Sequence, residues 1–197
     1  MIYPAVQNIR ILQNATWRGT YRATQQRRTI SVVAVDAGVP TFTSACHGLA
    51  AGTKVVLTTS NDEPAEVPCS LSLNAVYYVI ATGLTTDAFR LSATSGGSSI
   101  IVSGTVTGSL YVAVPLDLTG YVIDADIKDL DTLVQAATFT VTTPNANDGE
   151  FTLTLTPATA LGLAVKDYGY DVTLTSGAER YYWVTGVASV EITYSRN

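Results

Sequence analysis

Apolar and polar side chains alternate with a period of two in several short stretches of this 197-residue chain. Over positions 121–128 the odd positions hold Tyr, Ile, Ala and Ile, and three of the four even positions hold Asp, Asp and Lys. The same alternation recurs over 150–156 and 167–174. A period of two is that of a β-strand with one buried face and one face in water. The pattern predicts an all-β fold, namely an antiparallel β-sandwich.

Turn and cap residues separate the predicted strands. A Ser-Gly pair at 176–177 fits a tight hairpin between strands at 170–175 and 180–185, because glycine takes up the positive φ that such turns need. One short helix is predicted at 157–163, where Thr156 can cap the first turn and a proline occupies the first helical position. Helical periodicity is otherwise nearly absent.

The middle of the chain reads differently, because residues 35–109 are richer in glycine and serine. Short strands are expected there at 54–58, 76–81, 88–92 and 99–102. The flanking stretches 29–35 and 110–114 both favour strand and can pair with each other, as the two ends of an inserted domain must lie close together. We therefore expect two domains: a discontinuous host sandwich of residues 1–28 plus 113–197, and a second small β-domain of residues 29–112 inserted into it.

Composition narrows the function classes. Charged residues make up 14% of the chain and the net charge is −5, so the chain lacks the basic stripe that nucleic-acid binding requires. No apolar run approaches the ~20 residues of a membrane-spanning helix, and the first residues show neither the basic nor the apolar region of a signal peptide. We expect no nucleic-acid partner, no membrane association and synthesis in the cytoplasm of the producing cell.

Candidate chemical groups are few. His47, the single histidine, has no partners at the spacing of a catalytic triad, so a backbone hydrogen bond in a turn is the expected role of its imidazole. Cys46 and Cys69 can pair or can be two small side chains in a reducing compartment. The sequence predicts no catalytic residues, no cofactor and no metal site, and hence a protein that is not an enzyme.

The acidic positions Asp124, Asp126, Asp129 and Asp131 lack the glycine of a calcium loop and have Lys128 among them. A solvated strand face that discourages edge-to-edge pairing is the favoured interpretation, and Ca²⁺ near the last two aspartates is the alternative.

Interface candidates come from two regions. The first residues are more apolar than an isolated arm tolerates, and such arms add a strand to a neighbouring sheet. Tyr181, Tyr182 and Trp183 are consecutive, so at least one large ring faces outward, for a protein interface or for stacking on a sugar. The candidates are Ile2, Tyr3, Val6, Ile9, Ile11, Tyr181 and Trp183.

Two sets of motifs carry a resemblance to known families. The first consists of WRGTY at 17–21, DLTGY at 117–121, IDADIK at 123–128 and YGYDV at 168–172. It resembles a family of small immunoglobulin-like β-sandwich proteins encoded among the tail genes of tailed bacteriophages, with Lys128 where arginine is usual. The second set, HGL at 47–49, YYV at 77–79 and FRLSATSGG at 89–97, is similar to a small β-module of phage tail and fibre proteins.

These resemblances imply an immunoglobulin-like sandwich and a structural role in the virion. The expected protein is a component of the tail baseplate or tail-fibre assembly that docks on other virion proteins as a homo- or hetero-oligomer. Two alternatives share the fold: a carbohydrate-binding module that recognises a host-surface glycan, and a capsid decoration protein.

Overall fold

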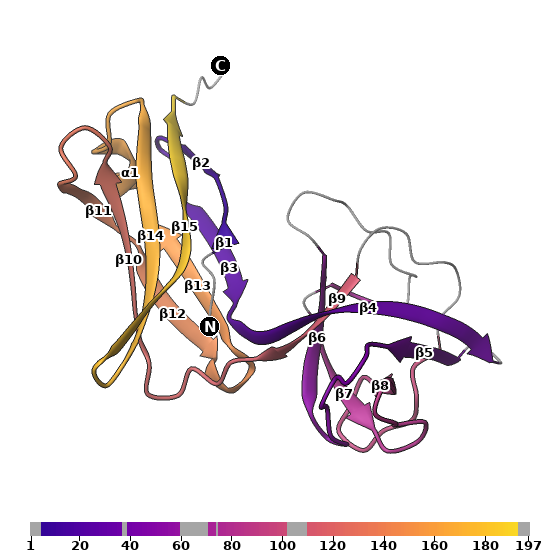
Figure 1. Cartoon of the computed structure of the whole chain (residues 1–197). Helices are drawn as coiled ribbons and strands as arrows, with labels where there is room; N and C mark the ends of the chain where they lie inside the picture. The colour runs from indigo at the N-terminus through magenta and orange to yellow at the C-terminus, as the bar shows by residue number, and fades with distance from the viewer. Residues whose placement is uncertain (1–4, 37–38, 60–70, 74, 102–109, 193–197) are drawn as a thin grey trace. The chain divides into compact units, whose positions relative to one another are not determined.

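The computed structural model describes residues 5–36, 39–59, 71–73, 75–101 and 110–192 (Figure 1). Strands dominate these residues, so the predicted all-β class is confirmed. The chain divides into two compact units, one of residues 1–23 with 117–197 and one of residues 24–116. Within the described residues, no helix is long and apolar enough to cross a membrane.

In the larger sheet of the first unit, β15 (Glu179–Glu191) lies between β14 (Asp167–Ser176) and the two short N-terminal strands β1 (Ala5–Val6) and β2 (Ile9–Leu12), which form the edge. β15 and β14 form a long antiparallel hairpin, and β14 pairs on its other side with β10 (Val122–Asp129). β11 (Gln135–Thr138) extends the sheet beyond β10. On the far side, β1 and β2 both run parallel to β15. The N-terminal residues therefore complete a sheet of their own chain.

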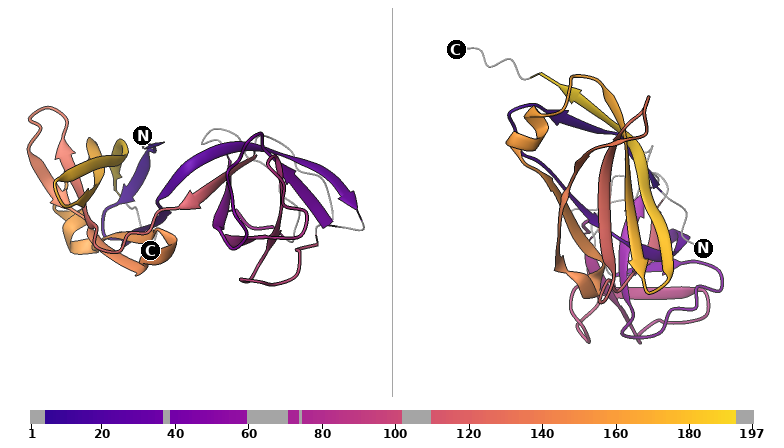
Figure 2. Two further views of the ribbon diagram at one scale, coloured as in Figure 1. Left: turned by 60° about the horizontal axis from the view of Figure 1, so that its bottom comes forward. Right: turned by 90° about the vertical axis from the view of Figure 1, so that its left-hand side faces the viewer.

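The smaller sheet has the order β12–β13–β3, formed by β12 (Thr140–Asn145), β13 (Glu150–Leu155) and β3 (Trp17–Arg22). Figure 2 shows the two sheets as layers facing each other. The core between them is aromatic: the ring of Trp183 on β15 lies 5.4 Å from that of Phe151 and 6.3 Å from that of Tyr21. Contacts across the layers thus define a β-sandwich.

The hairpin turn and the short helix predicted for this unit are both present. The hairpin turn contains Gly177 with a φ of 59°. A short α-helix, α1 (Pro157–Leu161), begins after Thr156, whose hydroxyl accepts a hydrogen bond of 3.2 Å from the Thr159 amide. A 3-10 turn, η1 (Ala146–Asp148), joins β12 to β13.

The second unit is a closed barrel with the strand order β4–β5–β8–β7–β6–β9. Its strands are β4 (Thr24–Asp36), β5 (Val39–Thr43), β6 (Lys54–Thr59), β7 (Val76–Ile80), β8 (Ala88–Ser92) and β9 (Leu110–Pro115). Phe42 and Phe89 stack in its core with ring centroids 5.6 Å apart. Closure gives each of these six described strands two neighbours, so none of them presents a sheet edge of the kind that recruits other strands.

Two details differ from the sequence-based expectations. β4 and β9 already pair at Thr24 and Pro115, so the barrel unit begins and ends a few residues outside the expected 29–112. Residues 99–101 of the strand expected at 99–102 are not in strand conformation, and residue 102 lies outside the described residues. The Ile100 amide donates a single hydrogen bond of 2.8 Å to the Leu91 carbonyl after a tight glycine turn.

Candidate docking surface

The turn between β10 and β11, residues 129–134, is held rigid by its own hydrogen bonds. The Asp129 amide donates to the Val134 carbonyl at 2.9 Å, and the Leu133 amide donates to the Asp129 carbonyl at 2.8 Å. The Asp129 carboxylate accepts from the amides of Asp131 and Thr132 at 2.9 and 3.2 Å. One aspartate thus satisfies several backbone groups, which is why this short segment keeps one conformation.

This rigid turn presents apolar side chains to water. Leu130 is 50% exposed, Val134 64% and Leu133 75%, the largest exposed fraction among the large apolar residues that the structure describes. Leu133 also has a φ of 58°, in the left-handed region. A residue with a Cβ loses about 1–2 kcal/mol there, and glycine or asparagine is the usual occupant. We call residues 129–134 the apolar turn.

An ion pair fastens the apolar turn to the segment before β14. The Lys166 ammonium lies 2.6 Å from the Asp129 carboxylate and 3.6 Å from that of Asp131, and 5.3 Å from the centroid of the Tyr168 ring. The hydrogen bond from Lys166 lowers the pKa of Asp129, and the same bond raises the pKa of Lys166. Val165, beside this lysine, is 50% exposed and adds to the apolar surface.

The residues that the sequence singled out in the N-terminal arm are placed differently. Ile9 and Ile11 are buried, at 8% and 0% exposure, so their side chains belong to the core of this chain. Val6 lies in β1 with its backbone paired to β15, and its side chain is outside the described part. Ile2 and Tyr3 lie outside the described residues. Of these five candidates, the two whose side chains the structure describes, Ile9 and Ile11, are therefore core residues and not exposed interface residues.

The three consecutive aromatic residues divide between core and surface. Trp183 packs against Tyr21 and Phe151 between the sheets, and the Tyr181 hydroxyl donates to the Glu179 carboxylate, a bond that raises the pKa of this phenol. The ring that faces outward is that of Tyr182, which is 51% exposed. The guanidinium of Arg180 lies 5.8 Å from its centroid.

His47 is buried in the barrel unit, and its imidazole hydrogen-bonds to the backbone, as the sequence predicts. Its Nδ1 accepts from the Leu49 amide at 2.9 Å, and its Nε2 lies 3.3 Å from the Ala88 carbonyl oxygen. Because one nitrogen accepts and the other donates, this geometry fits the neutral imidazole. The ring also meets Phe89 edge-on, so it connects a turn to β8.

The acidic positions of β10 and its turn engage neighbouring side chains. Asp126 accepts a hydrogen bond of 3.0 Å from the Thr138 hydroxyl, and both turn aspartates approach Lys166. Among the described residues, no three His, Cys, Asp or Glu side chains gather as a metal site would require. Cys46 is exposed, and Cys69 lies outside the described residues.

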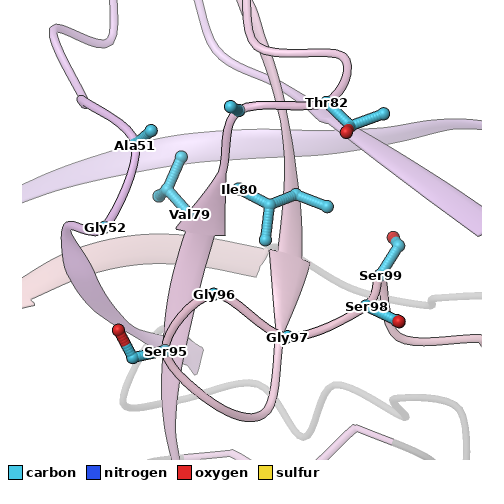
Figure 3. A pocket seen from close by; sticks show the side chains of 11 residues that line it. Ala51, Gly52, Val79, Ile80, Thr82, Ser95, Gly96, Gly97, Ser98 and Ser99 are labelled. Carbon is cyan, nitrogen blue, oxygen red and sulfur yellow. The ribbon is translucent and has the colours of Figure 1, made fainter.

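The barrel unit carries an open hollow of about 630 Å³ (Figure 3). Its wall consists of small, hydroxyl-bearing and aliphatic residues: Ala51, Gly52, Val79, Ile80, Ala81, Thr82, Ser95, Gly96, Gly97, Ser98 and Ser99. No residue of this wall is ionisable, so the hollow offers apolar contact, hydroxyls and peptide groups and no acid or base. Ile80 pairs with Arg90 across β7 and β8, and directly opposite side chains lie on the same face of a sheet.

The sequence pattern does not by itself predict the apolar turn. Its signal is the succession of Leu130, Leu133 and Val134 in a loop flanked by aspartates, where turn residues would be polar. The left-handed conformation of Leu133 adds a feature that only the structure reveals. No protein-family model and no curated protein sequence matches this chain.

Proposed function

We propose that this protein is a non-enzymatic structural component of a tailed-bacteriophage virion, in the tail baseplate or tail-fibre assembly. The two sets of motifs support the proposal, since one set falls in each compact unit. WRGTY, DLTGY and YGYDV belong to the sandwich unit, and HGL, YYV and FRLSATSGG belong to the barrel unit. The protein is made in the host cytoplasm and docks on other virion proteins.

An immunoglobulin-like classification of the sandwich is part of this proposal. In chain order, β3, β10, β12, β13, β14 and β15 take the positions of strands B, C, D, E, F and G. The observed orders β12–β13–β3 and β15–β14–β10 then match the B–E–D and C–F–G pairings of that fold. The barrel unit lies between β3 and β10, in place of the loop between strands B and C.

The apolar turn is the observation that carries a docking role. A leucine at a positive φ, three quarters exposed, lowers the stability of the isolated chain twice, through strain and through apolar surface in water. Strain of this kind clusters at binding sites, and contiguous exposed apolar surface marks interaction sites. A pre-ordered turn also loses little conformational entropy when it docks.

The test uses particles of a phage whose copy of the gene is deleted and supplied in trans. Wild-type protein is expected in purified particles by mass spectrometry, with immunogold label on the tail. The L133D variant, which places a charge at the apolar turn, is expected to fold, since Leu133 is 75% exposed, and to be lost from particles. V122D is the matched control, because Val122 is 59% exposed at the other end of β10.

Each result bears on a separate part of the proposal. Absence of the wild-type protein from particles would contradict the virion assignment. Equal incorporation of L133D and wild type would contradict docking through the apolar turn. Label on the head rather than the tail would instead identify a capsid decoration protein.

A carbohydrate-binding function is the second candidate, because the Tyr182 ring is exposed on the outer face of the larger sheet. Sugars stack on such rings. The test is a glycan array with wild type and Y182A; binding by wild type that Y182A loses supports this candidate, and an array without hits removes it.

A further inference from the structure

The apolar turn needs a receiving surface, and the chain itself carries one with matching chemistry. The turn offers aliphatic side chains next to Asp131, whose side chain is 86% exposed. The hollow on the barrel unit offers the side chains of Ile80, Ala51 and Ala81, without any carboxylate in its wall. A leucine and a valine are small enough for a hollow of about 630 Å³.

Charge distinguishes this pairing from contact between two identical turns. Two apolar turns face to face would bring the exposed Asp131 of each copy together. Lys166 lies 3.6 Å from Asp131 but is shared with Asp129, so each turn keeps a net negative charge and the two turns repel. Beside the hollow, Arg90 shares the face of Ile80, and its side chain passes Gly83 at about 3.0 Å from where a Cβ would stand. An aspartate next to inserted aliphatic side chains therefore meets a guanidinium at the hollow.

We infer that the apolar turn of one copy docks into the barrel-unit hollow of a second copy of this chain. The inference rests on the proposed docking function and names its partner. The two surfaces differ, so the contact is heterologous, and a pair of copies keeps one free hollow on the first copy and one free turn on the second. Such contacts close into a ring or continue as a filament, according to the rotation between copies.

The experiment is sedimentation velocity of the full chain up to millimolar concentration. Wild type is expected to form concentration-dependent oligomers. L133D at the turn and R90E at the hollow are each expected to weaken association by about tenfold or more. A81W, at an exposed wall residue, fills the hollow without entering the core and is expected to act like R90E. V122D is expected to associate like wild type.

A mixture of the L133D and R90E variants provides the most specific test of the inferred contact. An L133D copy retains its hollow and an R90E copy retains its turn, so an equimolar mixture is expected to form heterodimers and nothing larger. Neither variant alone forms them. A monomeric wild type, or a mixture that stays monomeric, overturns the inference. Loss of association in L133D with full association in both R90E and A81W also overturns it, because the turn then docks elsewhere.

The particle experiment separates this inference from the proposed function. Incorporation that depends on Leu133 without self-association in solution retains the docking role and rejects the second copy as partner. Self-association of a protein that is absent from particles supports the head-to-tail contact and rejects the virion assignment.

Discussion

The hydroxyl of Tyr170 on β14 donates a hydrogen bond of 2.6 Å to the backbone carbonyl of Gln7, between β1 and β2. Tyr170 is buried, and burial raises the pKa of its hydroxyl, with Tyr21 adding to the shift. The hydroxyl therefore stays protonated and remains a donor. This bond ties the N-terminal arm to the interior of the sandwich, beside its parallel pairing with β15.

Replacing Tyr170 with phenylalanine is expected to loosen the arm. The variant keeps the ring but leaves the Gln7 carbonyl without this partner, at a cost of about 1–2 kcal/mol in the free energy of unfolding. Urea denaturation measures the cost, and faster hydrogen exchange in β1 and β2 locates it. Y182F, at an exposed ring, is the control and is expected to change stability by less than about 0.5 kcal/mol. Equal exchange in Y170F and wild type would contradict the role of the bond.

Gly186 is expected to be intolerant of any side chain. A Cβ at this position would overlap the Gln7 carbonyl oxygen and lie 2.7 Å from its carbon, and these backbone atoms cannot move without shifting the arm. G186A is expected to destabilise by about 1–3 kcal/mol. G162A is the matched control, because its Cβ would sit 3.4 Å from the nearest carbonyl oxygen, at a helical φ of −71°. Comparable melting temperatures for the two variants would refute the close approach.

The apolar turn is expected to loosen in acid. Lys166 and the turn amides lower the pKa of Asp129 below its ordinary 3.8, so the unfolded chain binds this proton more readily than the folded one. The stabilisation by the Asp129 carboxylate is complete when the pH is above the pKa of this group in the unfolded chain. It disappears as the pH falls through the lower pKa of the folded protein. NMR of the turn amides should show this transition. D129N should remove it, and a transition retained in D129N would assign it to another group.

Leu133→Asn is expected to stabilise the protein while weakening its docking. Asparagine tolerates a positive φ and removes apolar surface from water, so we expect a gain of about 0.5–1 kcal/mol in the free energy of unfolding. Val134→Asn, without a positive φ, should be neutral within about 0.5 kcal/mol. Urea denaturation of the two variants checks the difference. A destabilised L133N would mean that the leucine serves the fold rather than a partner.

Replacement of Trp183 by alanine is expected to lower the free energy of unfolding much more than replacement of Tyr182. Trp183→Ala removes packing against Phe151 and Tyr21 and should cost about 3 kcal/mol or more, whereas Tyr182→Ala should cost less than about 1 kcal/mol. Thermal unfolding by circular dichroism compares them. For this reason a glycan-binding test at Trp183 would report unfolding, and Tyr182 is the residue to replace. Similar losses of stability in both would contradict the division between core and surface.

The sequence by itself determined the all-β fold class and the positions of several turns and caps, because these depend on local chemistry. Alternation of period two, the Thr156 cap and the Gly177 turn each depend on a few adjacent residues, so the alternating strands, the helix and this hairpin were predictable. The strand expected at 99–102 shows no such alternation and is not found over residues 99–101. Pairing of the stretches around an insert was predictable for a similar reason, because its ends must meet.

Tertiary structure decided which face each side chain uses. β15 pairs Tyr182 with Thr173 but Val184 with Val172, so Trp183 is the extra residue of a bulge and turns toward the core. Ile9 and Ile11 are core residues because β2 finds a partner more than 170 residues along the chain, Ala188 facing Ile9. The conformation of Leu133 follows from the closure of its hairpin. These outcomes depend on which residues of distant strands lie opposite each other. A period of two indicates which side chains of a strand share a face, but not which residues of another strand they pair with.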